Sequence, residues 1–120
     1  GLGLYIVKIR VKLQNQQGGN NVSNKEVRVV AKDILKEGSS AAFFADAKEL
    51  VEKTRLEDGC LFYDIWTSSE NPNEIAFLEG WESQAALDAH METEHFVRIV
   101  AKLNDYRAKP TDIAIYTKPE

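Results

Sequence analysis

Several residue types are scarce in this sequence. Its 120 residues include one cysteine, one methionine and two histidines. The single cysteine, Cys60, excludes a disulfide within the chain and fits a reducing compartment, so we expect a cytoplasmic protein. Charged residues interrupt the apolar stretch at residues 4–13. That stretch is therefore neither a membrane helix nor the apolar segment of a signal peptide.

The chain also lacks an excess of basic residues. Lysine and arginine together number 15 against 19 aspartate and glutamate residues, which gives a formal net charge of −4. A protein that binds nucleic acid needs a basic face. We therefore expect no nucleic acid and no membrane among its partners. The length and the 43% share of hydrophobic residues are typical of a single globular domain.

Motifs that hold cofactors are absent as well. The sequence has no glycine-rich phosphate loop, no flavin or nicotinamide fingerprint and no Ser-His-Asp spacing. Its histidines, His90 and His95, are five positions apart across a predicted helix break, and no third ligand stands out. That spacing does not match the i,i+4 pair of a helical metal site. We expect no cofactor and no metal ion.

Hydrophobic periodicity predicts the elements of the fold. Strands are expected at residues 4–13, 27–35, 60–67, 75–82 and 112–117, and helices at residues 41–56, 84–92 and from Thr93 onward. Ser39 or Ser40, then Ser83 and Thr93, are the expected N-caps. Gly59 is expected as the left-handed residue at the end of the first helix. A polar loop fills residues 14–24.

From residue 27 the order of elements is β-α-β-β-α-β, which is the ferredoxin-like order of an α+β fold with an antiparallel sheet. We expect one domain, with residues 1–26 as an additional N-terminal strand and loop and residues 27–118 as the core. Two helices cover one face of such a sheet and leave the other bare. Bulky residues expected there, Tyr63, Ile65, Trp66 and Phe77, predict a homodimer that buries this face. The N-terminal strand would extend its own sheet or cross to the partner.

The candidate site residues gather at residues 78–96, which hold both histidines. His90, beside a buried helical stripe, is the expected catalytic base; the alternative is a structural histidine bonded to backbone or carboxylate. His95 lies in the first turn of the next helix, where the dipole favours a neutral imidazole; the alternative is a surface position. Glu79, between aromatic residues, is expected to pair with Arg55 or Arg98 if buried.

Aromatic residues are the expected walls of a substrate pocket, or alternatively parts of the core or of an interface. The candidate substrate-binding residues are Trp81, Tyr63, Trp66 and Phe96, together with His95. Cys60 follows a glycine and has no neighbour expected to lower its pKa. It is therefore expected to be a small buried residue and not a nucleophile.

Many of these residues are shared with a known family. The shared positions are Thr54, Arg55, Glu57, Gly59, Cys60, Tyr63, Asn71, Pro72, Glu79, Trp81, Glu82, Ser83, Leu87, His90, His95 and Phe96. In their order and spacing, residues 27–117 resemble the antibiotic biosynthesis monooxygenase superfamily of small dimeric α+β barrels. The resemblance implies ferredoxin-like protomers that dimerise through their sheets, each with a pocket between its sheet and its helices.

The resemblance spans several activities. Members include cofactor-independent oxygenases of quinol-type aromatics, haem-degrading enzymes and isomerases of phosphorylated autoinducer-type ketones. The haem-degrading branch has asparagine, tryptophan and histidine where this chain has Ala31, His90 and Val100, which argues against haem. We expect a cofactor-independent monooxygenase of a small quinol or phenol that uses molecular oxygen. The alternatives are an isomerase or detoxifying enzyme for a small carbonyl compound, and a non-catalytic dimer that binds a small ligand.

Overall fold

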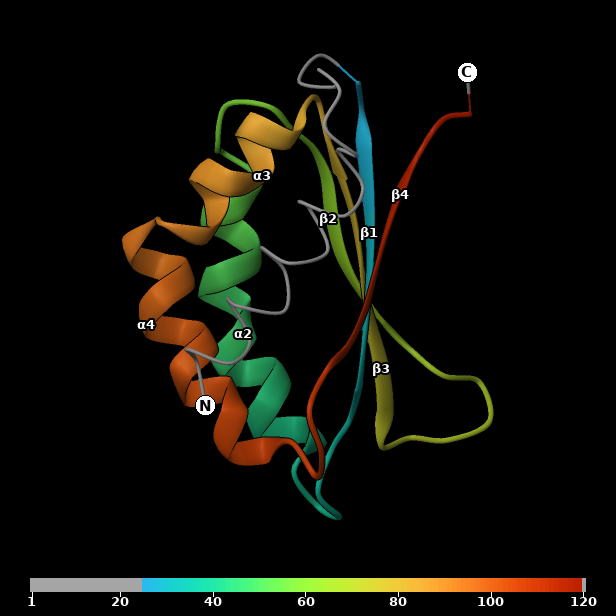
Figure 1. Cartoon of the computed structure of the whole chain (residues 1–120). Coiled ribbons are helices and arrows are strands. Elements are labelled where there is room, and N and C mark those ends of the chain that lie inside the picture. The colour runs from blue at the N-terminus through green and yellow to red at the C-terminus, as the bar shows by residue number, and fades with distance from the viewer. Residues whose placement is uncertain (1–24, 120) are drawn as a thin grey trace.

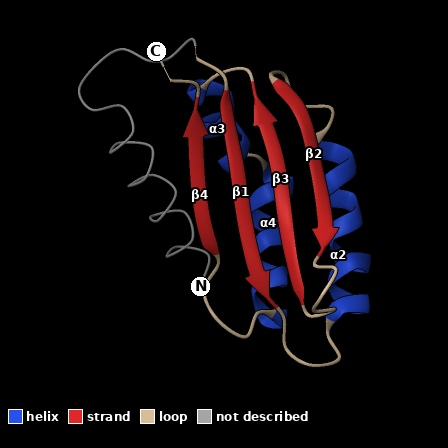
Figure 2. Ribbon diagram, turned by 90° about the vertical axis from the view of Figure 1, so that its right-hand side faces the viewer, coloured by secondary structure: helices blue, strands red, loops and turns tan. Residues whose placement is uncertain are grey.

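The protein folds into two layers, a sheet and the helices that cover one of its faces (Figures 1 and 2). The structure is a computed structural model, and it describes residues 25–119. The strand expected at residues 4–13 and the loop expected at residues 14–24 lie outside the described residues. None of the described helices is both long enough and apolar enough to cross a membrane.

The described elements follow the predicted order. They are β1 (Val27–Ile34), α2 (Ser40–Thr54), β2 (Cys60–Thr67), β3 (Glu74–Trp81), α3 (Gln84–Met91), α4 (Glu94–Leu103), the 3-10 helix η1 (Asn104–Tyr106) and β4 (Asp112–Thr117). The strands lie in the order β2-β3-β1-β4, and all neighbours are antiparallel. This confirms the ferredoxin-like α+β fold, with its second helix divided into α3 and α4.

Two side-chain caps produce that division. The Ser83 hydroxyl accepts a hydrogen bond from the Ala86 amide at 3.1 Å, and the Thr93 hydroxyl accepts one from the Phe96 amide at 3.3 Å. Each cap satisfies an amide that lacks a partner within its helix. Both caps were expected from the sequence. Because Thr93 begins a new helix, the chain changes direction between α3 and α4 (Figure 1).

The end of α2 differs from the prediction. The helix stops at Thr54, two residues before the expected end. Gly59 does have a left-handed backbone, with a φ of 86°, but it lies directly before β2 and not at the end of the helix. Residues 55–59 therefore form a loop between α2 and β2. On α2, Glu49 and Lys53 are four positions apart and form an ion pair at 2.8 Å.

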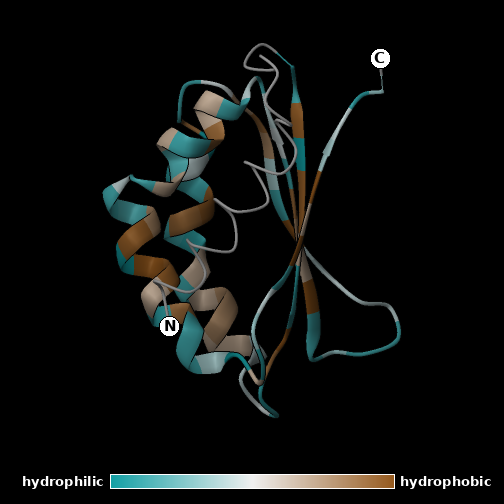
Figure 3. Cartoon of the chain, in the orientation of Figure 1, coloured by the Kyte–Doolittle hydropathy of each residue, from teal (hydrophilic) through white to brown (hydrophobic). Residues whose placement is uncertain are grey.

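The core lies between the sheet and the helices, where the apolar residues of both layers meet (Figure 3). One apolar stripe of α4 is buried, and it consists of Phe96, Ile99, Val100 and Leu103. However, Tyr63 and Phe77 are also buried in this core, and Ile65 packs against it. Their expected place on the bare face of the sheet is therefore wrong. Trp66, whose position alternates with theirs, is 61% exposed on the opposite face.

One polar cluster is buried at the end of β1. Asp33 is 1% exposed, and its Oδ1 lies 2.9 Å from Nε of Arg107 and accepts a hydrogen bond from the Thr111 hydroxyl at 2.5 Å. Arg107 and Thr111 flank the irregular chain that leads into β4. The cluster therefore ties this chain to the sheet.

Candidate functional site

The register of the sheet determines which residues lie side by side on the strand side of the site. On the inner face, Tyr63, Glu79, Val29 and Ile115 are neighbours in one row across β2, β3, β1 and β4. Trp81 lies one step further along β3, on the same face. Glu79 is the polar member of this row, and α3 and α4 lie above it.

His90 is buried among aromatic rings at the C-terminal end of α3. Its side chain is 2% exposed. The ring centroids of Trp81, Phe96 and Tyr63 lie 4.7, 4.8 and 5.4 Å from that of His90. Three predicted pocket residues therefore surround the predicted base. His90 is buried because these rings cover it from the strands as well as from α4.

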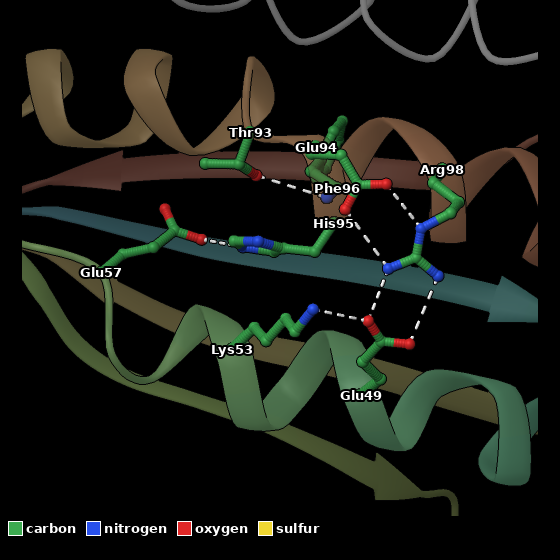
Figure 4. A network of polar contacts seen from close by, with 8 residues as sticks. All are labelled: Glu49, Lys53, Glu57, Thr93, Glu94, His95, Phe96 and Arg98. Carbon is green, nitrogen blue, oxygen red and sulfur yellow. Dashed lines mark hydrogen bonds and ion pairs between the residues drawn. The ribbon is translucent and has the colours of Figure 1, made fainter.

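Glu57 joins His90 to His95. Its Oε2 lies 2.9 Å from Nδ1 of His90 and 2.6 Å from Nε2 of His95 (Figure 4 shows the His95 contact). An ionised carboxylate only accepts hydrogen bonds, so both imidazole nitrogens donate to it. The proton of neutral His90 is then on Nδ1, which leaves the lone pair on Nε2.

Gly59 allows the Glu57 loop to approach α3. A Cβ atom added to Gly59 would lie 2.6 Å from the Cβ of Ala86, closer than two such atoms can pack. Its positive φ also favours glycine. Both constraints act two residues after Glu57, and they keep the loop beneath α3, where the carboxylate reaches both histidines.

The pKa values of the two glutamates move in opposite directions. Burial raises the pKa of Glu57, but hydrogen bonds and charge from His90 and His95 outweigh burial and leave it below the ordinary value. Burial also raises the pKa of Glu79, and the nearby His90 and the Trp81 hydrogen bond only partly oppose this. The carboxyl of Glu57 therefore ionises at a lower pH than that of Glu79.

Glu79 does not have the partner expected for it. Its Oε1 accepts a hydrogen bond from the Trp81 indole at 3.0 Å. Arg55 instead donates to the backbone carbonyl of Tyr63 at 3.1 Å and to Asp64 at 2.7 Å. Arg98 bridges Glu49 and Glu94 on the surface between α2 and α4 (Figure 4). An arginine partner for Glu79 was therefore a wrong expectation.

A small cavity lies between these residues. It leaves about 10 Å³ for the centre of a water molecule, which is room for roughly one water. Its lining consists of Val29, Glu79, Leu87, His90, Met91, Phe96 and Ile115. A larger open groove of about 400 Å³ lies between α2 and β2, but no histidine or tryptophan lines it. Of these two, the small cavity is therefore the one whose lining includes a candidate base, His90.

The other predicted residues have different positions. Trp66 lies on the outer face of the sheet, away from this cavity. Cys60 is half-buried, and burial, with the charges of Glu57 and Glu79, raises the pKa of its thiol to about 11. The thiol stays protonated near neutral pH, as expected of a residue that is not a nucleophile.

The role of Glu57 was missed in the sequence. It follows α2 in a loop, where no periodic pattern marks it. The available signals were its place two residues before a glycine and its membership of the residues shared with the family. The sequence analysis named no third residue beside the two histidines, whereas the structure brings Glu57 to both of them.

The chain is similar to known proteins over the residues that form this site. The family model for antibiotic biosynthesis monooxygenase matches residues 27–102. The uncharacterized protein sll1783 of Synechocystis is 37% identical over 89 residues, which are 73% of this chain and 60% of that relative. The chain thus spans less than two thirds of that relative's length. The Bacillus subtilis protein named Putative monooxygenase YcnE is 35% identical over 71 residues, 59% of this chain and 75% of the relative.

Solved structures share the fold. A conserved protein from Methanosarcina mazei Go1 superposes with a TM-score of 0.77 at 35% identity, covering 80% of this chain and 95% of that one. A structure described as antibiotic biosynthesis monooxygenase gives a TM-score of 0.74 at 34% identity, covering 78% and 99%. Residues 27–102, which the family model matches, include Glu57, His90 and His95.

Proposed function

The chain belongs to the antibiotic biosynthesis monooxygenase family, and we propose that it oxygenates a small phenolic or quinol compound without a cofactor. One observation carries this proposal. The buried imidazole of His90 lines a cavity, while its Nδ1 is held by the Glu57 carboxylate at 2.9 Å. The names of the Bacillus subtilis relative and of Putative monooxygenase Rv0793 of Mycobacterium tuberculosis point to the same reaction class.

His90 acts as the base in this proposal. Because Glu57 accepts the Nδ1 proton in a hydrogen bond, Nε2 is free to accept a proton from a substrate hydroxyl. The carboxylate also stabilises the imidazolium that forms. The surrounding rings of Trp81, Tyr63 and Phe96 exclude water and offer flat surfaces for an aromatic substrate. His95 holds Glu57 in place from the other side.

The substrate itself supplies the electrons. A phenolate transfers electrons to molecular oxygen, one oxygen atom forms a bond to a ring carbon, and the other leaves as water. A phenol and one O₂ thus give a para-quinone and one H₂O, and the ring supplies all four electrons. The cavity is smaller than a phenol. Substrate entry therefore requires side chains of the helix layer, such as Leu87 and Met91, to move.

Oxygen dependence tests this function. A panel of hydroquinones and phenols is incubated with the protein under ¹⁸O₂, and oxygen uptake is followed with product mass. We expect one labelled oxygen atom in the product for each O₂ consumed. Turnover that continues without oxygen would overturn the proposal and favour an isomerase or carbonyl-detoxifying enzyme. Saturable binding without turnover would also overturn it, in favour of a ligand-binding protein.

The outer face of the sheet supports the proposed homodimer. Phe62, Trp66 and Tyr116 are exposed there, and the same face carries cationic β1 residues and anionic residues of β2 and β4. A face with both charge signs can pair with a copy of itself about a two-fold axis. We expect Trp66→Lys to convert a dimer to a monomer in light scattering. Leu56→Lys, at a position 85% exposed outside the sheet, is the control that should stay dimeric. A monomeric wild-type protein would contradict this proposal.

A further inference from the structure

We propose that Glu57, His90 and His95 form a binding site for a divalent transition-metal ion such as Zn²⁺. One ligand atom from each of the three side chains lies within 4.8 Å of the other two. Oε2 of Glu57 is 2.9 Å from Nδ1 of His90 and 2.6 Å from Nε2 of His95. They come from three separate parts of the chain, the loop after α2, the end of α3 and the start of α4. The proposal rests on this convergence and not on the proposed oxygenase reaction.

The distances between the ligand atoms suit one ion after a small adjustment. Zinc binds imidazole nitrogen and carboxylate oxygen at roughly 2.0–2.2 Å, so ligands in a tetrahedral site lie roughly 3.3 Å apart. The carboxylate oxygen is now 2.9 Å from one nitrogen and 2.6 Å from the other. The ligand atoms of the two histidines lie within 4.8 Å of each other and must come to this spacing too, while the oxygen must withdraw by less than about 1 Å. Glu57 lies in a loop, where such a shift disturbs no helix or strand.

The chemistry of the ligands selects the class of metal. Two imidazoles and one carboxylate suit zinc and neighbouring transition metals, whereas magnesium and calcium prefer oxygen ligands alone. Three protein ligands leave a fourth position open for water or another ligand. The side chains of Glu57 and His95 are 12% and 14% exposed, while that of His90 is 2% exposed. The ion would therefore enter from the side of Glu57 and His95.

Metal binding would also change what His90 presents to the cavity. An ion on Nδ1 takes the lone pair at that nitrogen, and the proton of the neutral ring moves to Nε2. The cavity then faces an N–H donor in place of an acceptor. If His90 is the base of the proposed reaction, the metal-bound protein is inhibited. The binding itself is independent of that reaction.

Calorimetry on the full chain tests the site. After treatment with EDTA and dialysis, the protein is titrated with ZnCl₂ and, separately, with MgCl₂. We expect one zinc per chain and no saturable magnesium binding. Glu57→Gln and His95→Gln should each weaken zinc binding at least tenfold. Asp58→Asn, at the exposed acidic neighbour, and Cys60→Ser, at the nearest thiol, should leave it unchanged.

Each of the following results would contradict the proposed zinc site. Equal zinc affinity in wild type and in folded Glu57→Gln, or loss of binding only in Cys60→Ser, would place the ion elsewhere. An absence of saturable zinc binding would mean that the cluster is a hydrogen-bonded triad alone. Circular dichroism verifies that the variants fold. Zinc should raise the melting temperatures of wild type and of Asp58→Asn by nearly the same amount. Failure of zinc binding leaves the oxygenase test untouched, because that test measures oxygen in the product.

Discussion

Two buried carboxylates on the same face of the sheet have very different surroundings. Asp33, near the end of β1, has an arginine at 2.9 Å and a hydroxyl donor. Glu79, toward the C-terminal end of β3, has an indole donor and lines a cavity together with His90. The first carboxylate has a cation beside it and ties one segment of chain to the sheet. The second takes its hydrogen bond from a neutral indole and borders space that a ligand could use.

The difference between these surroundings indicates which carboxylate supports the fold and which belongs to a functional site. A buried acid with a cationic partner contributes to structure, and removal of the partner leaves an uncompensated charge. A buried acid without such a partner, beside a cavity and another titratable group, is typical of functional sites. We therefore expect substitutions around Asp33 to affect folding first. Substitutions around Glu79 and His90 should affect turnover first.

The largest expected effect on stability is at Arg107. Arg107→Ala leaves the Asp33 carboxylate buried without its cation, and we expect the free energy of unfolding to fall by about 3–5 kcal/mol. Urea denaturation measures the loss. Lys109→Ala, at an exposed position two residues away, should change it by less than about 0.5 kcal/mol. An equal loss in both variants would mean that the Asp33 cluster is not a structural tie.

His90→Gln should produce the opposite pattern. Glutamine retains an N–H donor for Glu57 and fills part of the same space, but it cannot act as a base. We expect turnover to fall by about 10²–10⁴-fold, with a smaller loss of stability than in Arg107→Ala. The rate of product formation by folded protein is the measurement. Unchanged turnover would remove His90 from the mechanism.

The smallest expected effect on stability is at Glu79, and it depends on pH. Burial raises the pKa of this carboxyl in the folded protein. As pH rises above the ordinary glutamate pKa, the unfolded chain ionises while the folded protein still holds its proton, so this group lowers stability. The decline ends above the folded-state pKa. Glu79→Gln removes the group while an amide oxygen can still accept from Trp81.

We therefore expect Glu79→Gln to gain stability relative to wild type as pH rises from about 4 toward neutrality. Urea denaturation of both proteins across this range measures the difference, with EDTA present throughout. A difference that stays constant with pH would show that Glu79 has the same pKa in both states. A difference that shrinks would reverse the sign of its contribution.

The sequence was sufficient for the elements and for much of the site, because both depend on local patterns. Ser83 and Thr93 mark helix starts by their own hydroxyl chemistry, and the apolar stripe of α4 follows from its spacing. Alternation shows which residues share a face of a strand, but not which face meets the helices. For this reason Tyr63 was placed on the wrong side of the sheet.

Contacts between polar side chains that are far apart in the chain leave no local pattern in the sequence. Glu57 lies 33 and 38 positions from the two histidines it contacts. Its position depends on where α2 ends and on the close approach that Gly59 permits. The partner of Glu79 was mispredicted for a related reason. A buried carboxylate suggests an arginine, whereas here a neutral indole two residues along the same strand supplies the donor.

The break at Thr93 has a consequence for how the two histidines work together. On one continuous α-helix, residues five positions apart point about 140° away from each other, so their rings could not reach the same oxygen atom. Here the Thr93 hydroxyl donates to the carbonyl of His90 at 2.7 Å and accepts from the amide of Phe96, which ends one helix and starts the next. An uncharged side chain whose hydrogen bonds go to the backbone of α3 and α4 thus sets the angle between the imidazoles. The pair exists as a unit because the helix is interrupted.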